Sequence, residues 1–129
     1  MMYYRRKILL ALIQQFGGSL SQTDLQKLLF LFCQRQSIPA YHFIPYKFGC
    51  FSYQSYQDIS TLTKYNIVNE SNRKCEIIDK NNYINQLTLK DRISLIQFYN
   101  EFKEKRGNEL IKYVYLKYPY YAINSEIKD

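Results

Sequence analysis

The sequence of 129 residues contains no tryptophan, one histidine, three prolines and four glycines. The glycines stand at positions 17, 18, 49 and 107, so the chain has no glycine-rich loop of the kind that binds phosphate. His42 lies near no nucleophile motif and no partner at metal-ligand spacing. Glu101 and Glu104 alternate with lysines, a pattern typical of a solvated helix surface. We therefore expect no enzyme activity, no catalytic residue, no metal and no cofactor.

Cysteine is also scarce. Cys33, Cys50 and Cys75 form an odd set separated by 17 and 25 residues, which excludes a complete disulfide framework and shows no paired metal-ligand spacing. No apolar run approaches the roughly 18 residues of a membrane span. The apolar stretch after Lys7 ends at Gln14, which is too early for a signal peptide. We expect a reduced, cytoplasmic protein.

Aromatic and basic residues are abundant. Fourteen tyrosines and eight phenylalanines contribute to a 47% apolar composition, which is sufficient for the core of one domain spanning residues 1–129. The formal net charge is +7, and residues 1–56 hold six basic side chains against one acidic side chain. A positive field favours anionic partners such as nucleic acid, acidic proteins or anionic lipid, although a solvated surface would also account for it.

Apolar spacing predicts two helices in the first part of the chain. Leu9, Leu12, Ile13 and Phe16 lie on one face of a helix over residues 3–16. A capping box at residues 21–24 opens a second helix that continues to about residue 35. Its apolar stripe is so broad that we expect this helix to be central and mostly buried, with Lys27 off the stripe; the stripe consists of Leu25, Leu28, Leu29, Phe32 and Cys33.

The middle of the chain predicts strands around a third helix. We predict an edge strand or two short extended pieces over residues 41–48, because Pro45 cannot donate a hydrogen bond to a neighbouring strand. Gly49 is the expected hinge and Ser52 the expected cap of a helix over residues 53–65. The inward residues of that helix are predicted to be Tyr56, Ile59, Leu62 and Tyr65. A hairpin over residues 67–78, with its turn between residues 69 and 74, follows.

Two further helices are predicted towards the C-terminus. Thr88 caps a helix over residues 89–105, with Ile93, Ile96 and Phe102 facing inward and Gly107 ending it. The last helix covers residues 108–118, and the apolar segment after it either packs back on the domain or continues into more protein. The predicted fold is α+β, mainly α with a small β-sheet and a winged-helix-like core, in the order helix, helix, strand, helix, strand, strand, helix, helix.

A winged-helix core indicates duplex DNA as one partner, because the third helix of such a domain enters the major groove. The candidate DNA-binding residues on that helix are Gln54, Gln57, Ser60, Thr61 and Lys64, and those expected to hold phosphates are Arg73, Lys74, Arg5, Arg6 and Lys7. The third helix carries one basic residue and also Asp58, and about 17 residues separate it from the second helix. The polar residues of the third helix are also consistent with the solvent-exposed side of an amphipathic helix.

Three segments resemble the Panacea-type (SocA-like) antitoxin and adaptor domains of bacteria: DLQKLLFL at 24–31, YKFGCFS at 46–52, and Asp58-Ile59 with Leu62. Cys50 stands where that family pattern has proline. The chain also resembles N-terminal regions of bacterial proteins that continue, after a segment like YPYYAINS at 118–125, into another domain. The resemblance implies a non-catalytic module in toxin neutralisation, phage defence or gene regulation, and a chain that is the N-terminal part of a longer protein.

Two functions follow as expectations. The first is a winged-helix module that binds duplex DNA in regulation or phage defence. The alternative is a protein-interaction module, antitoxin-like or adaptor-like, that docks a toxin or a downstream domain. Its partner-binding residues would be the aromatic side chains of the 41–53 segment, in which interface-forming residue types are dense: Tyr41, Phe43, Tyr46, Phe48, Phe51 and Tyr53.

Overall fold

The computed structural model describes residues 2–47 and 49–126. The elements in chain order are α1 (Tyr4–Gln15), β1 (Ser19–Ser21), α2 (Gln22–Cys33), β2 (Ile44–Tyr46), β3 (Gly49–Phe51), α3 (Tyr53–Lys64), β4 (Val68–Ser71), β5 (Lys74–Ile77), η1 (Ile84–Gln86), α4 (Leu89–Phe102), α5 (Gly107–Lys117) and η2 (Pro119–Ala122). The predicted class and helix order are confirmed. The structure adds the short strand β1, places β2 within the predicted 41–48 segment, and adds β3 directly after that segment.

The three-stranded sheet has the topology of a winged helix. Its antiparallel order is β1-β5-β4, so that the strand between α1 and α2 pairs with the hairpin that follows α3. The turn of this hairpin, Asn72-Arg73, has φ angles of 52° and 59°, the left-handed conformation that suits the twist of a two-residue hairpin. We call the β4–β5 hairpin the wing. The predicted position of its turn is confirmed.

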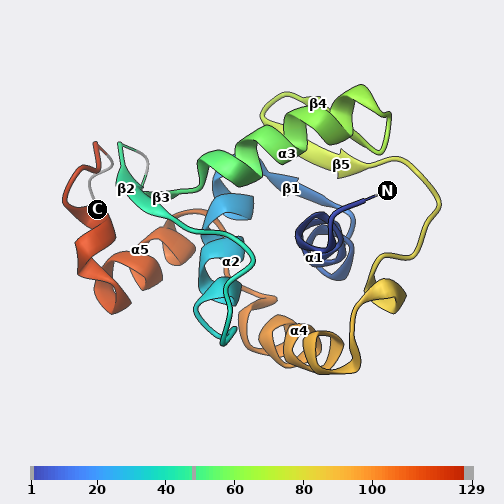
Figure 1. Cartoon of the computed structure of the whole chain (residues 1–129). Helices are drawn as coiled ribbons and strands as arrows, with labels where there is room; N and C mark the ends of the chain where they lie inside the picture. The colour runs from blue at the N-terminus through green and yellow to red at the C-terminus, as the bar shows by residue number, and fades with distance from the viewer. Residues whose placement is uncertain (1, 48, 127–129) are drawn as a thin grey trace.

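The core is built around α1 and α2. Every residue from Ile8 to Ile13 is buried, so α1 is covered on all sides, between the sheet and α4 (Figure 1). On α2 the buried residues are Leu25 and all those from Lys27 to Cys33. A helix that is apolar almost all round must be covered in this way, and the predicted central position of α2 is confirmed.

Three predicted helix caps are present. The Ser21 hydroxyl accepts the Asp24 N–H at 3.1 Å, the Ser52 hydroxyl accepts the Ser55 N–H at 3.1 Å, and the Thr88 hydroxyl accepts the Asp91 N–H at 3.2 Å. Each bond satisfies a backbone donor that the first turn of a helix leaves without a partner. These short polar signals therefore fix where α2, α3 and α4 begin.

The predicted inward face of α3 is partly wrong. Ile59 and Leu62 are buried, but Tyr56 is 58% and Tyr65 69% exposed. The buried set is Ser55, Asp58, Ile59 and Leu62, which keeps the i, i+3, i+4, i+7 spacing of one helix face but includes polar residues. The buried face of α3 therefore differs from the predicted one, because Arg5 and Arg6 of α1 donate hydrogen bonds to Asp58 and make its burial possible.

The predicted inward face of α4 is also partly wrong. Phe102 is buried, whereas Ile93 is 48% and Ile96 43% exposed. Leu95 and Phe98 point inward instead, and the Phe98 ring lies 5.5 Å from that of Phe32 and 6.0 Å from that of Phe16. This helix has apolar residues on two faces, so spacing alone could not select between them. Gly107 does not end α4 as predicted but begins α5.

The segment from β2 to β3 forms a separate two-stranded hairpin. Ile44 pairs with Phe51, Pro45 with Cys50 and Tyr46 with Gly49. The short strand β2 lies within the predicted 41–48 segment, whereas β3 was not predicted and begins at Gly49, the expected hinge. Gly49 has a φ of 101°, and a Cβ at this position would lie 3.2 Å from the Tyr115 hydroxyl. Glycine is therefore required both by the backbone and by the contact with α5.

The C-terminal segment packs back on the domain. The Phe30 ring lies 5.1 Å from the Tyr118 ring and 4.5 Å from the Tyr121 ring. The Glu126 N–H donates to the Lys47 carbonyl at 2.7 Å, so this end of the chain reaches the β2–β3 hairpin. Among the described residues, no helix is long and apolar enough to cross a membrane.

Candidate functional site

Four half-exposed or exposed rings form an aromatic cluster where the β2–β3 hairpin meets α3. The Phe51 ring lies 4.9 Å from that of Tyr46, 4.9 Å from that of Tyr53 and 5.8 Å from that of Tyr56. Tyr53 and Tyr56 are each 58% exposed. Such rings normally lose part of their surface to the core, so a group of them at the surface makes this region a candidate site of interaction.

A cavity of about 560 Å³ lies beside this aromatic cluster. Its walls come from α2, the β2–β3 hairpin, α3 and the wing. The lining combines the four rings with apolar, amide, hydroxyl and charged side chains: Gln22, Thr23, Leu25, Gln26, Lys27, Tyr46, Cys50, Phe51, Tyr53, Tyr56, Gln57, Ile59, Glu70 and Cys75. Its volume lies within the range of roughly 300–1,000 Å³ that is usual for sites of small molecules or anchoring side chains.

Gln26 joins the walls of the cavity. Its amide oxygen accepts the Ser52 N–H at 3.0 Å, and its amide nitrogen donates to the Ser55 hydroxyl at 2.9 Å. Both bonds connect α2 to the first turn of α3, just where Ser52 caps that helix. The rings of Phe51, Tyr53 and Tyr56 are thus carried on a backbone that is hydrogen-bonded to α2.

Lys27 is the cation in the cavity wall. Only 1% of this residue is exposed. Burial lowers the pKa of the Lys27 ammonium, and the neighbouring Cys50 and Asp24 oppose that shift. Burial also raises the pKa of the Cys50 thiol to about 12, with Lys27 acting in the opposite direction. Cys50 is therefore an unreactive thiol at neutral pH. Lys27, predicted to lie off the buried stripe, is wholly within it.

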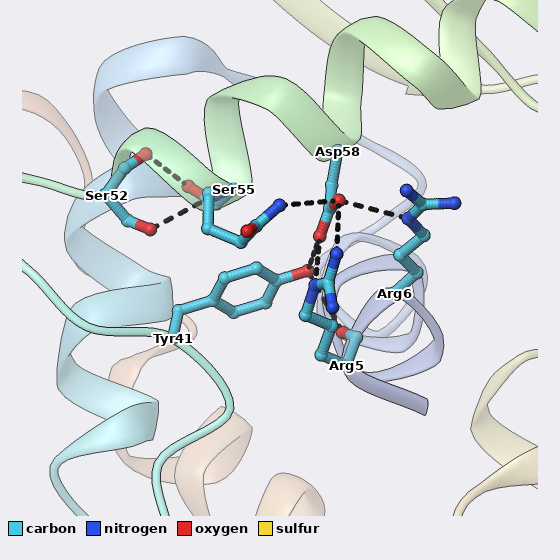
Figure 2. A network of polar contacts seen from close by, with 7 residues as sticks. Arg5, Arg6, Tyr41, Ser52, Ser55 and Asp58 are labelled. Atoms are coloured by element: carbon cyan, nitrogen blue, oxygen red, sulfur yellow. Dashed lines mark hydrogen bonds and ion pairs between the residues drawn. The ribbon is translucent and has the colours of Figure 1, made fainter. Parts of the chain in front are cut away.

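Asp58 is the second buried charge, and it lies in a polar network between α3 and α1 (Figure 2). Arg5 Nε donates to its Oδ2 at 2.8 Å and Arg5 NH2 to its Oδ1 at 3.1 Å. Arg6 Nε donates to Oδ1 at 3.0 Å, the Tyr41 hydroxyl to Oδ2 at 2.8 Å and Gln54 Nε2 to Oδ1 at 3.2 Å. Burial alone would raise the pKa of Asp58, but the donors from Arg5, Tyr41 and Arg6 together lower it.

The network changes the role expected for Arg5 and Arg6. Both were predicted to hold phosphates, and both have an Nε committed to Asp58, with side chains 30% and 16% exposed. Lys7 is half-buried. The single negative charge of Asp58 offsets one of the two positive charges of Arg5 and Arg6. The first helix therefore offers less free positive charge than its sequence indicates.

The other candidate DNA-binding residues lie on α3 and the wing. Gln54, Gln57, Ser60 and Lys64 are exposed and Thr61 is half-buried, all on the helix that the winged-helix topology assigns to the major groove. Arg73 and Lys74 are exposed at the turn of the wing. Gln57 also lines the cavity, so this residue is a candidate both for DNA binding and for partner binding.

The aromatic residues predicted to bind a partner divide into two groups. Tyr41 is only 2% exposed, and its hydroxyl donates to Asp58, so its predicted role at an interface is wrong; the ring instead fills the space between α1 and α3. Phe43 is half-buried against Phe30, with 5.4 Å between the ring centres. Tyr46, Phe51 and Tyr53 belong to the aromatic cluster. Phe48 lies outside the described residues.

Sequence reasoning missed Lys27 and Asp58 as site residues and did not include Tyr56. A charged residue inside an otherwise apolar helical run, as Lys27 is between Leu25 and Leu28, was the available signal. For Asp58 the signal was its i+4 spacing from Leu62, which was predicted to face inward.

The remaining residue types that often act in catalysis or metal binding are the histidine and the three cysteines. His42 is exposed and lines neither this cavity nor the second cavity, of about 390 Å³, between α1 and α4. Cys33, Cys50 and Cys75 are buried and unbonded to one another. Across residues 2–47 and 49–126, no three His, Cys, Asp or Glu side chains are placed to hold a metal. Comparison of the chain with models of protein families, with curated proteins and with solved structures gave no match.

Proposed function

We propose that this domain is a non-catalytic protein-interaction module, antitoxin-like or adaptor-like, that binds a protein partner at the aromatic cluster and its cavity. The observation that supports this most directly is the exposure of Tyr53 and Tyr56 beside a cavity of about 560 Å³. Tyrosine and phenylalanine contribute much of the binding free energy at protein interfaces when a partner seals them from water. The resemblance to Panacea-type domains favours the same class of function.

The charge distribution favours protein over DNA at this face. The lining of the cavity holds one buried cation, Lys27, and one half-buried carboxylate, Glu70. A surface that binds duplex DNA is normally strongly positive and polar. The rings of the aromatic cluster would instead gain from an apolar partner surface.

The test compares a variant of the aromatic cluster with a control tyrosine directly after the end of α3. Proteins captured by the domain after nuclease treatment would be purified, and their dissociation constants measured with the wild type, with Tyr53→Ser/Tyr56→Ser, and with Tyr65→Ser. Tyr65 is 69% exposed but does not line the cavity. Loss of two interface rings should weaken binding by about 30-fold or more. A partner set that binds all three proteins equally would contradict the proposal.

A second candidate, duplex-DNA binding, is favoured by the winged-helix topology together with exposed Lys64, Arg73 and Lys74. It predicts affinity for a duplex that falls steeply with salt, because bound cations are released. The discriminating variant is Arg73→Asn/Lys74→Gln; Asn is chosen because Arg73 has a φ of 59°, which Asn tolerates better than Ala. Absence of binding to a duplex at low salt would remove this candidate without affecting the first.

A further inference from the structure

Helix α4 presents a row of large apolar side chains to solvent. Leu89 is 67%, Ile93 48% and Ile96 43% exposed. The buried side chains of the same helix lie on its opposite face and are those of Leu95, Phe98 and Phe102. Packing within the domain therefore accounts for only one of the two apolar faces of α4. The exposed row is the feature that a further contact would cover.

The exposed row has the spacing of a helix–helix seam. Its three members lie four and then three residues apart, and Asn100 continues the row after another four residues. Alternating steps of four and three residues are the a and d pattern of a coiled coil, in which the side chains of one helix fit between those of another. A single asparagine in such a row is common, because it restricts the alignments that the two helices can adopt. The row is therefore suited to the matching row of another helix.

The charged side chains beside the row have opposite signs at the two ends of α4. Lys90 in the first turn and Glu101 in the last turn lie on the same side of the row, and both are exposed. Glu101 pairs with Arg35, but its side chain is still 50% exposed, so it can accept a second cation. The other side of the row, which we call the basic side, carries Arg92 and Lys103. This difference limits how a second helix can lie on the row.

An antiparallel pair of α4 helices brings opposite charges together. A two-fold axis between antiparallel helices places the same side of each helix in contact, so that the contact is self-complementary. With Ile93 of each copy against Ile96 of the other, Lys90 lies beside Glu101 of the second copy, and symmetry repeats this pair. The positive end of each helix dipole also lies beside the negative end of the other. A parallel pair would instead place Lys90 next to the basic side of the second copy.

We propose that this domain forms a symmetric dimer in which α4 of one copy packs antiparallel against α4 of the other. The helix has 14 residues and is about 21 Å long, so the contact is smaller than the roughly 800 Å² per partner of a standard interface. We therefore expect a weak dimer, with a dissociation constant between about 10 µM and 1 mM. Because α4 lies away from α3 and the β2–β3 hairpin, the dimer leaves both aromatic clusters accessible (Figure 1). The inference does not depend on the proposed function.

The first test measures association of the unmodified domain. Sedimentation equilibrium would follow its mass from about 10 µM to about 1 mM, and amide chemical shifts would be recorded over the same range. The mass should rise from that of one chain towards that of two, and the shifts that change with concentration should belong to α4. A domain that stays monomeric at about 1 mM, or shift changes confined to other elements, would overturn the proposal and assign the row to a different occupant.

A pair of variants separates the seam from general apolar association. Ile93→Asp places two like charges in the centre of the contact and should weaken the dimer at least about tenfold. The control Leu116→Asp introduces the same charge on α5, where Leu116 is 88% exposed and outside the row, and should leave the dimer unchanged. If Leu116→Asp weakened association as much as Ile93→Asp does, the proposal would fail.

Charge reversal tests the antiparallel arrangement. Lys90→Glu and Glu101→Lys each bring like charges together in a dimer of one variant, so each should weaken association by about threefold. In an equal mixture the two variants pair with each other and both ion pairs form again, so association should return to that of the wild type. Effects within one chain, such as loss of the contact with Arg35, would not be restored by mixing. A mixture that associates no better than the separate variants would overturn the proposal.

Discussion

The two buried charges among the described residues, Asp58 and Lys27, have pKa values shifted in the same direction but with opposite consequences. The pKa of Asp58 is lowered by its donors, so the fold stabilises its charged form. The pKa of Lys27 is lowered by burial, so the fold destabilises its charged form. Asp58 joins α3 to α1 and to Tyr41, whereas Lys27 forms part of a cavity wall. The donors around the first charge stabilise the fold, whereas the burial of the second charge costs stability.

Removal of the Asp58 carboxylate should produce the largest effect on stability. Asp58→Ala leaves Arg5 and Arg6 without their acceptor, and breaking a buried ion pair costs about 3–5 kcal/mol. Because the two arginines are 30% and 16% exposed and can reach water, we expect the lower end of that range, about 3 kcal/mol. The free energy of unfolding in urea measures it.

The matched control for this variant is Glu101→Ala. Glu101 pairs with Arg35, but its side chain is 50% exposed, so the loss should stay below about 1 kcal/mol. If the two variants lost equal stability, the contrast between the buried ion pairs of Asp58 and the surface ion pair of Glu101 would be wrong.

Low pH should weaken the interactions of Asp58 with its hydrogen-bond donors. A carboxylate with a lowered pKa in the folded state stabilises the fold fully above its unfolded pKa of about 3.9, and this contribution is lost as the pH falls towards the folded pKa. Unfolding of the wild type and of Asp58→Asn would be compared from about pH 6 down to about pH 3. The difference between the two proteins should shrink at the acid end. Parallel curves would show that Asp58 is not the group responsible.

Replacement of Lys27 should have the smallest effect and the opposite tendency. Lys27→Met keeps a long side chain and removes a charge that burial disfavours, so we expect a change within about 1 kcal/mol, neutral or stabilising. The unfolded state holds the Lys27 proton more tightly, so the stability of the wild type should rise relative to the variant as the pH approaches about 10. A large loss of stability in Lys27→Met would show that this charge, like Asp58, is structural.

The sequence was sufficient for the order of the helices because that information is local. Apolar spacing defined α1 and α2, and the hydroxyl caps at Ser21, Ser52 and Thr88 defined where three helices begin. The strand β1 has only three residues and is stabilised by pairing with β5, far along the chain, so no local pattern could show it.

The faces of α3 and the site were harder to predict because they depend on contacts between distant residues. Asp58 becomes an inward residue only when Arg5 and Arg6, more than fifty positions earlier, supply its donors. Tyr41 looked like an interface residue until its hydroxyl was found on that carboxylate. Of the predicted partner-binding residues, Tyr46, Phe51 and Tyr53 are placed together, whereas the cavity beside them also requires α2 and the wing.

The wing and the mouth of the cavity form one mechanical unit. The carbonyl of Arg73 at the wing turn accepts the backbone N–H of Gln22 at 2.9 Å, and the side chain of the same Gln22 donates to Glu70 on the wing at 2.7 Å. Sliding the wing past the start of α2 would break both bonds at once. A displacement of the wing relative to α2 would therefore also change the part of the cavity that Gln22 and Glu70 line.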